Sequence, residues 1–201
     1  MVSPMSLAAA LKRILPFFTP ENLARTKIDY APKPGETALL IIDVQREYCA
    51  PLGPRGTLKT RKISSDIKRL TPAFRAAGIP TYVVYYDDAD KPLGKVDFYK
   101  VKPGPQDIAV RKYTDSAFRS GKLRGLLEEH GRKKLLVCGF NLSACVAQTI
   151  EDARREGYDV TLLSDLTGND SMNGDGRRAL AKMTELGVEI TTAKQALRAL
   201  H

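Results

Sequence analysis

From residue 37 onward, apolar and polar positions follow two alternating patterns. Short apolar runs, typical of strands buried on both faces, occur at residues 38–42, 81–86, 134–138, 159–163 and 188–192. Between these runs, apolar residues at helical spacing predict helices over 59–77, 121–130, 143–156 and 173–186. Gly78, Gly157 and Gly187 each follow a predicted helix, where a left-handed residue favours the helix end. The alternation predicts a single three-layer α/β domain with a mostly parallel sheet.

A different pattern precedes this domain. Residues 5–15 form a short amphipathic segment in which Lys12 and Arg13 interrupt the apolar stretch. A secretory signal peptide has its charges before the apolar region, so a signal peptide is not expected, and an organelle transit peptide has little support. We predict a helical extension and a Pro-rich linker over residues 1–34, followed by the α/β domain over residues 35–201.

Composition narrows the class of protein. The chain is 43% hydrophobic and 27% charged, as in a globular protein with a substantial core. No apolar run approaches the roughly 20 residues that span a bilayer, so no membrane association is expected. The three cysteines are too few and odd in number for a disulfide framework, which favours a reducing, cytoplasmic location. With two histidines, His130 and His201, and no CxxC spacing, we expect no metal and no cofactor.

The net charge of +9 raises the question of nucleic-acid binding. The excess of basic residues lies in residues 54–75 and 101–134. In the first of these segments, Ile63, Ile67, Leu70 and Phe74 recur at helical spacing, so the basic side chains form the outer face of a helix. We interpret this charge as a solvated face or an attraction for anionic substrates, and we expect no nucleic-acid partner.

In a parallel sheet of this kind, ligands bind beyond the carboxyl ends of the strands. Asp43 follows four consecutive aliphatic residues at such an end, so we expect its carboxylate to be partly desolvated and its pKa to be raised. The same position suits a cap or turn residue that closes a strand. Val44 and Gln45 follow without a turn signal, which weakens that alternative.

Two further residues have a comparable position. Cys145 lies in the first turn of a predicted helix, where the helix dipole favours a thiolate, although a buried structural cysteine fits equally well. Lys112 ends a short apolar run that begins at Ile108, and it suits either an ion cluster with a thiolate and a carboxylate or an exposed position after a strand. Cys138 has the pattern of a core residue, and Cys49 lies in a polar loop.

Taken together, three segments resemble the isochorismatase-like hydrolases, also called cysteine hydrolases. They are residues 38–48 (ALLIIDVQREY), 111–118 (RKYTDSAF) and 137–158 (VCGFNLSACVAQTIEDARREGY). The resemblance extends from about residue 37 to residue 192, in the family's order. It implies a Rossmann-like α/β/α fold and a catalytic triad of Asp43, Lys112 and Cys145.

The resemblance has further implications for the site. It implies a cis peptide bond between Phe140 and Asn141, which directs the backbone N–H groups of Asn141 and Cys145 toward a developing oxyanion. Tyr48 and Phe118 match aromatic positions that line the family's pocket, and Phe140 is expected beside them. Leu142 stands where the family usually has Thr, which predicts a more apolar pocket floor.

Family nicotinamidases add an Asp/His metal cluster between the first two segments. This chain has no histidine between Tyr48 and Lys112, so that activity is not expected. Members that hydrolyse the vinyl ether of isochorismate generally lack the cysteine, so Cys145 favours acyl chemistry. We therefore expect a cysteine-dependent hydrolase that cleaves a C–N bond of a small-molecule amide through a thioester.

The alternatives are a vinyl ether hydrolase of the isochorismatase type and a catalytically silent small-molecule-binding module on the same fold. A small-molecule substrate is the expected partner. The family habit and the N-terminal extension favour a homo-oligomer, either a dimer or a tetramer.

Overall fold

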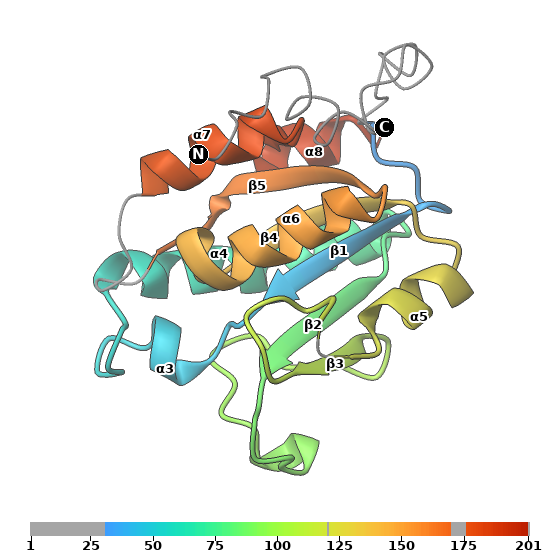
Figure 1. Cartoon of the computed structure of the whole chain (residues 1–201). Helices are drawn as coiled ribbons and strands as arrows, with labels where there is room; N and C mark the ends of the chain where they lie inside the picture. Colours follow the sequence, from blue (N-terminus) through green and yellow to red (C-terminus); the bar gives the residue numbers. More distant parts are fainter. Residues whose placement is uncertain (1–30, 120, 170–175, 201) are drawn as a thin grey trace, which may run out of the picture.

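The computed structural model describes residues 31–119, 121–169 and 176–200. Within these ranges, one fully parallel sheet has the strand order β3-β2-β1-β4-β5-β6 (Figure 1). Its strands are β1 (Thr37–Ile42), β2 (Thr81–Tyr86), β3 (Ile108–Lys112), β4 (Lys134–Gly139), β5 (Asp159–Thr167) and β6 (Glu189–Thr191). The predicted strands are confirmed, although β5 continues four residues beyond the apolar run.

The centre of the sheet is apolar on both faces because β1 lies between β2 and β4 and helices cover both of its faces. Every residue of β1 is buried, and its Leu40 is in register with Tyr82 of β2 and Val137 of β4. Continuous apolar runs are typical of parallel strands covered on both faces. The continuous apolar run at residues 38–42 thus forms one of the two central strands of the sheet.

Helices cover both faces of the sheet. On one face, α4 (Leu58–Ala76) and α8 (Ala193–Arg198) pack against Leu39, Ile41 and Leu136. On the other face lie α5 (Leu123–Glu129), α6 (Ala147–Arg155) and α7 (Gly176–Glu185), which pack against Leu40 and Val137. The Rossmann-like three-layer α/β/α fold is confirmed.

The helix ends also agree with the sequence. Gly78, Gly157 and Gly187 have φ values of 76°, 88° and 67°, a left-handed conformation that glycine adopts readily. Two short helices lacked a sequence signal, α8 and α3 (Arg46–Cys49). The connection from β2 to β3 contains a 3-10 turn, η1 (Leu93–Lys95). Phe98 in the same connection forms an isolated β-bridge with Gln45, which follows β1.

The predicted N-terminal helices lie outside the described residues, as do the first residues of the predicted helix 173–186. The end of the Pro-rich linker is anchored to the domain, since Arg132 donates hydrogen bonds to the carbonyl oxygens of Pro34 and Gly35. The division of the chain at residues 34 and 35 stays a prediction.

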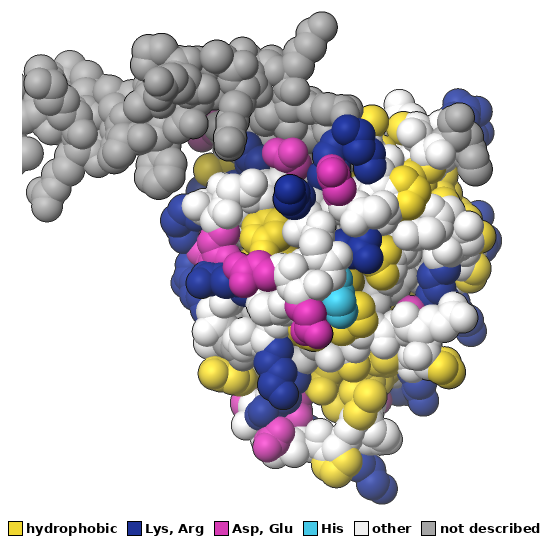
Figure 2. All heavy atoms as spheres, turned by 90° about the vertical axis from the view of Figure 1, so that its right-hand side faces the viewer, with side chains coloured by type: hydrophobic (Ala, Val, Ile, Leu, Met, Phe, Trp, Pro, Cys, Tyr) yellow, Lys and Arg dark blue, Asp and Glu magenta, His cyan; other side chains and the backbone are white. Residues whose placement is uncertain are grey.

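The basic face of α4 has the expected form. Ile63, Ile67 and Phe74 are buried, while Lys62 and Arg69 are exposed and both pair with Asp66. Figure 2 shows basic and acidic side chains interspersed over another face of the molecule. In the described part of the chain, none of the helices has the length and apolar character needed to cross a membrane.

Candidate active site

The order of the strands reverses beside β1. The chain runs from β1 outward to β2 and β3, and then returns to place β4 on the other side of β1. Loops that leave neighbouring strands in opposite directions open a crevice at their carboxyl ends. Asp43 directly follows β1, Lys112 is the last residue of β3, and Cys145 lies six residues beyond the end of β4.

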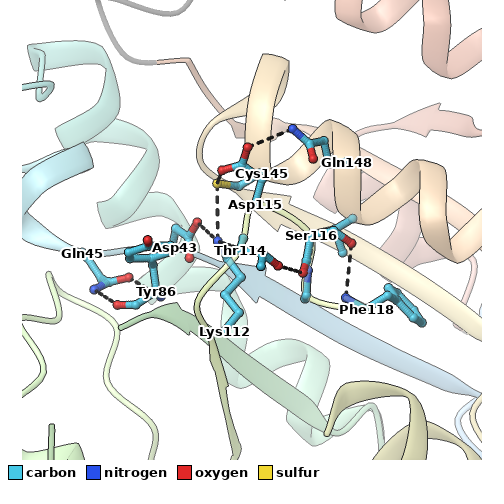
Figure 3. Close-up of polar contacts among 12 residues, drawn as sticks. Asp43, Gln45, Tyr86, Lys112, Thr114, Asp115, Ser116, Phe118, Cys145 and Gln148 are labelled. Carbon is cyan, nitrogen blue, oxygen red and sulfur yellow. Dashed lines mark hydrogen bonds and ion pairs between the residues drawn. The ribbon is translucent and has the colours of Figure 1, made fainter. Parts of the chain in front are cut away.

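These three side chains meet in one cluster, with the ammonium group of Lys112 at its centre (Figure 3). Lys112 Nζ lies 2.9 Å from Asp43 Oδ2 and 3.4 Å from Cys145 Sγ. It also donates to the carbonyl oxygen of Thr114 over 3.1 Å. The exposed fractions of Lys112, Asp43 and Cys145 are 0%, 1% and 7%, so the cluster is almost fully removed from solvent.

Lys112 reaches the other two residues across the end of β2. Its Nζ lies 5.0 Å from the centre of the Tyr86 ring, a distance suited to a cation–π interaction. The backbone of Tyr86 is held in turn by Gln45, whose side chain accepts from its N–H over 2.8 Å and donates to its carbonyl over 3.0 Å. Gln45, three residues beyond β1, thereby holds the end of β2 over which Lys112 extends.

The backbone at Asp43 departs from the sequence-based expectation. Asp43 has a φ of 51°, and the N–H of Gln45 donates to its carbonyl oxygen over 2.8 Å. The chain therefore turns tightly here, although Val44 and Gln45 carry no turn signal. Aspartate tolerates the left-handed conformation better than most residues. Asp43 therefore has both of the properties considered for it: its backbone makes the turn, and its carboxylate faces Lys112.

The segment that carries Cys145 depends on a close approach between β4 and β1. Gly139 has a φ of 118°, and a Cβ atom there would lie 2.0 Å from the carbonyl oxygen of Ile42. The next peptide bond, Phe140–Asn141, is cis, as the resemblance implied. A π-helical turn, η2 (Leu142–Val146), follows and leads into α6, and it places the Cys145 side chain beside Lys112.

Burial and charge set the protonation of the cluster. Burial raises the pKa of Asp43, although Lys112 opposes this, so the expectation of a raised pKa is confirmed. Burial disfavours the charged form of Lys112, but the charges of Asp43 and Cys145 outweigh it and raise the lysine pKa. Burial and the charge of Asp43 raise the pKa of Cys145 to about 12. Burial and Asp43 thus favour the thiol form in the resting site, although Lys112 acts in the opposite direction.

The remaining cysteines have the environment of core residues. Cys49 and Cys138 are both fully buried. Burial raises the pKa of Cys49 to about 12, and it also raises that of Cys138. Cys145 is the cysteine that contacts a buried cation, which separates it from the other two.

The four residues predicted to line the pocket have different surroundings. Tyr48 lies near the cluster: burial raises its pKa, and the charges of Asp43 and Glu47 add to that effect. Phe118 packs in the core with its ring centre 5.4 Å from that of Tyr158. Phe140 and Leu142 are also buried, on opposite faces of the sheet. A substrate-binding role for all four stays a prediction.

Sequence reasoning missed Asp115 and Gln148. Cys145 Sγ lies 3.7 Å from Asp115 Oδ1, and Gln148 Nε2 donates to Asp115 Oδ2 over 2.9 Å. Asp115 stands between two recognised residues, Lys112 and Phe118, in a loop that carries no periodic signal. Its position became evident only from the fold of that loop.

The loop is attached to α6 by a buried hydrogen bond and an ion pair. The N–H of Ala117 donates to Thr149 Oγ1 over 3.1 Å. Arg119 forms a two-pronged ion pair with Asp152, at 2.7 and 3.2 Å. Because α6 also continues from the turn that holds Cys145, one helix positions both Cys145 and the loop of Asp115.

A separate pocket lies along the edge strand β3. Its lining includes Tyr85, Arg111, Tyr113 and Lys122. Side chains alternate between the two faces of a strand, so Arg111 projects away from the face of Lys112. Arg111 also pairs with Asp90 at 2.8 Å. This pocket is therefore distinct from the cluster around Lys112.

Comparisons with known proteins agree with this geometry. The family model described as the Isochorismatase domain matches residues 37–195. The secreted isochorismatase effector Isc1 of Verticillium dahliae is 28% identical over 158 residues, covering 74% of this chain and 80% of that protein. The ureidoacrylate amidohydrolase RutB of Pseudomonas savastanoi pv. phaseolicola is 28% identical over 178 residues, covering 67% of this chain and 71% of that protein.

A solved structure gives the same fold. The cysteine hydrolase from Pseudomonas syringae pv. phaseolicola superimposes with a TM-score of 0.75 at 23% identity. The match covers 85% of this chain and 95% of that one.

Proposed function

The chain belongs to the isochorismatase family, and we propose that it is a hydrolase that cleaves a C–N bond of a small amide through a thioester on Cys145. One observation carries the proposal: a single buried ammonium group, Lys112 Nζ, contacts both a carboxylate and a thiol. An acid/base group, a cation and a nucleophile within contact distance are the components of covalent acyl transfer.

In the first half-reaction, Asp43 acts as the general base. Its raised pKa makes it a stronger base than an ordinary aspartate, and it takes the proton from the Cys145 thiol as the sulfur attacks the carbonyl carbon. Lys112 stays protonated and stabilises the charge that moves between carboxylate and sulfur. As the tetrahedral intermediate collapses, the C–N bond breaks and Asp43 returns its proton to the leaving nitrogen.

In the second half-reaction, water replaces the amine. Asp43 removes a proton from the water, and the oxygen attacks the thioester carbonyl. The carbon–sulfur bond then breaks, and the thiol is regenerated with the proton held by Asp43. The first half-reaction leaves Cys145 acylated, and the second restores the thiol and the carboxylate, so the whole cycle consumes only the amide and one water.

The oxyanion of both intermediates requires hydrogen-bond donors. We assign this role to the backbone N–H groups of Asn141, which precedes the η2 turn, and of Cys145, which lies within it. Tyr48, Phe118, Phe140 and Leu142 are proposed to shape the apolar surroundings of the substrate.

A screen of small amides, ureido acids and vinyl ethers tests the proposal. With an amide found in this way, Cys145→Ala is expected to abolish turnover while its circular dichroism spectrum stays that of the native chain. Cys138→Ala is the matched control because Cys138 is buried in β4, away from the cluster, and it is expected to retain turnover. Full activity of Cys145→Ala would exclude the covalent route.

Two alternatives give other results in the same experiments. A vinyl ether hydrolase acts on the vinyl ethers of the screen and tolerates loss of the thiol. A silent binding module turns over none of the compounds, and its three cysteines are alkylated slowly and at similar rates. The contact between Cys145 and Lys112 favours the amide hydrolase over both.

The oligomeric state and the cellular location of the protein stay predictions. We propose a homo-oligomer, a dimer or a tetramer, which size-exclusion chromatography with light scattering tests. A cytoplasmic location is proposed from the cysteine content, while the related Isc1 is described as secreted.

A further inference from the structure

A second carboxylate lies directly beside the nucleophile. Asp115 Oδ1 is 3.7 Å from Cys145 Sγ, on the side of the sulfur away from Asp43 (Figure 3). Its other oxygen accepts a hydrogen bond from the neutral amide of Gln148 over 2.9 Å, which orients the carboxylate. Asp43 already serves as the acid/base group in the proposed mechanism, so Asp115 needs another explanation.

Asp115 forms no ion pair with another residue that the structure describes. Of the cations in its neighbourhood, Lys112 pairs with Asp43, and Arg119 shares the carboxylate of Asp152 with Arg155. The contacts of Asp115 are to a neutral amide and a neutral thiol. Asp115 is also exposed, so a ligand can reach its carboxylate from the solvent side.

Three charged side chains adjoin the sulfur or pair beside it. Asp43 and Lys112 balance one another, and Asp115 adds a negative charge next to the sulfur. The sulfur gains negative charge during attack, which the neighbouring carboxylate opposes; accordingly, the charge of Asp115 contributes to the raised pKa values of Asp43 and Cys145. A cation placed next to Asp115 removes this opposition at the moment when the thiol loses its proton.

A second, independent observation points to a ligand with N–H donors. Asp43 is 1% exposed, and its Oδ1 has no hydrogen-bond partner among the residues that the structure describes. A buried carboxylate oxygen without a donor is costly, so this oxygen is suited to an N–H group supplied by a substrate. The two carboxylates thus flank the sulfur with acceptor atoms on both sides.

Three arginines near the carboxyl ends of the strands are already paired with acidic residues, so they do not favour a substrate carboxylate. Arg46 lies 3.1 Å from Asp97, Arg55 lies 3.7 Å from Glu47, and Arg111 lies 2.8 Å from Asp90. At the sulfur itself, the cation Lys112 is balanced by Asp43, and the remaining charged group is the carboxylate of Asp115. The site is therefore suited to bind a cationic group.

We propose that Asp115 is a specificity-determining residue that binds a cationic group of the substrate. The substrate class is then a small amide that carries an ammonium or guanidinium group a few bonds from the reacting carbonyl carbon. This inference rests on the proposed function, because it takes Cys145 as the nucleophile. The substrate amide N–H faces Asp43, and the cationic group faces Asp115.

Two thiol reagents of similar size and opposite charge test the inference without knowledge of the substrate. The ethylammonium and ethylsulfonate methanethiosulfonates both convert a thiol into a mixed disulfide and release methanesulfinate. Their rates at Cys145 are measured at pH 7 by peptide mass spectrometry and divided by their rates with 2-mercaptoethanol. We expect the normalised ratio of cationic to anionic rates to fall by about 10-fold or more in Asp115→Asn, in line with the strength of a charged hydrogen bond.

The control is Asp88→Asn, which removes the same charge from an exposed loop position and is expected to leave the ratio unchanged. Asp115→Lys is expected to reverse the preference. Equal ratios in the native chain and Asp115→Asn, with Cys145 still the fastest thiol, would overturn the inference and leave the proposed function intact. A Cys145 that reacts no faster than Cys49 and Cys138 with either reagent would overturn the proposed function itself.

Turnover gives a second readout. Ammonia release is compared for glycinamide, propionamide and succinamate, which carry an ammonium, no charge and a carboxylate. The native chain is expected to prefer glycinamide, and Asp115→Asn is expected to raise KM for glycinamide about 10- to 100-fold with little change for propionamide. A uniform fall in kcat for all three amides would instead assign Asp115 a structural role and contradict the inference.

Discussion

Lys112 Nζ lies 2.9 Å from Asp43 Oδ2, and the two side chains have exposed fractions of 0% and 1%. The pair joins β3 to the end of β1 across the intervening strand β2. Burying an ion pair costs desolvation free energy, so it is weak evidence for stability, but removing one partner leaves an uncompensated buried charge. Substituting one member of the pair is therefore expected to have a large effect on stability, which makes the pair a sensitive test of the site.

Lys112→Met is expected to lower the free energy of unfolding by about 3–5 kcal/mol, because Asp43 then stays buried without its cation. Urea denaturation at pH 7, followed by circular dichroism, measures the change. Turnover is expected to be lost as well, since the charge that moves between Asp43 and Cys145 loses its stabilising partner.

Two further variants accompany this measurement. Lys62→Met removes an exposed partner of Asp66 and is expected to cost less than about 1 kcal/mol. The double variant Asp43→Asn with Lys112→Met removes both charges, so it is expected to unfold at a higher urea concentration than Lys112→Met alone. Equal midpoints for Lys112→Met and Lys62→Met would contradict a buried pair.

The alkylation of Cys145 by iodoacetamide is expected to accelerate with pH throughout the range from 7 to 10. Its pKa is raised to about 12, so the thiolate fraction in the resting site still grows about tenfold per pH unit in this range. Mass spectrometry of the Cys145 peptide gives the rate at each pH. A plateau near pH 8 would show that the sulfur rests as a thiolate, contrary to the burial argument.

Gly139→Ala is expected to destabilise the chain by more than about 3 kcal/mol and to abolish turnover. The new Cβ would lie 2.0 Å from the Ile42 carbonyl oxygen, at a φ of 118°. The clash forces apart the end of β1, which leads to Asp43, and the segment that leads to Cys145. Thermal unfolding and ammonia release measure the two effects.

Gly131→Ala is the control that separates the backbone strain of a left-handed residue from the steric clash expected at Gly139. Gly131 is also left-handed, with a φ of 66°, but a Cβ there would have no heavy atom of the described residues within 4 Å. Its expected cost is about 1–2 kcal/mol, the general penalty for that conformation. If both variants had the same stability, the close approach of β4 and β1 would not be a determinant of the fold.

Thr149→Val tests how α6 holds the loop of Asp115. The substitution preserves shape but leaves the buried N–H of Ala117 without its acceptor, so the expected cost is about 1–3 kcal/mol. The preference of Cys145 for the cationic methanethiosulfonate should also weaken, because the loop is no longer fixed. Thr184→Val, which changes an exposed hydroxyl bonded to Leu180, is expected to alter neither property.

Much of the fold was predictable because the strongest signals in the chain are buried strands and the glycines that follow helices. The apolar run at residues 38–42 identified β1, and the same run identified Asp43 as the residue at its carboxyl end. Helix α8 was missed because it is a short element.

The candidate site was predictable in its members but not in its electrostatics. Lys112 and Cys145 were candidates from their own positions, but only the resemblance joined them with Asp43 in one triad, because no spacing rule pairs them. The helix-terminus argument left out burial and the charge of Asp43, which raise the pKa of Cys145 and depend on long-range packing. Asp115 was missed for a related reason: a loop residue acquires its neighbour only when the loop is fastened to α6.

The three residues of the cluster lie on separate stretches of the chain, and the contact between Lys112 and Cys145 spans 33 residues. Asp43 is contributed by the first strand, and two further strands form before Lys112 is reached. Contacts between distant parts of a chain form late in folding, after the entropy of closing the intervening loops has been overcome. A sheet that lacks β1, β3 or β4 therefore lacks the cluster. The proposed chemistry begins only when these three strands are in place, so recovery of turnover on refolding would time their assembly.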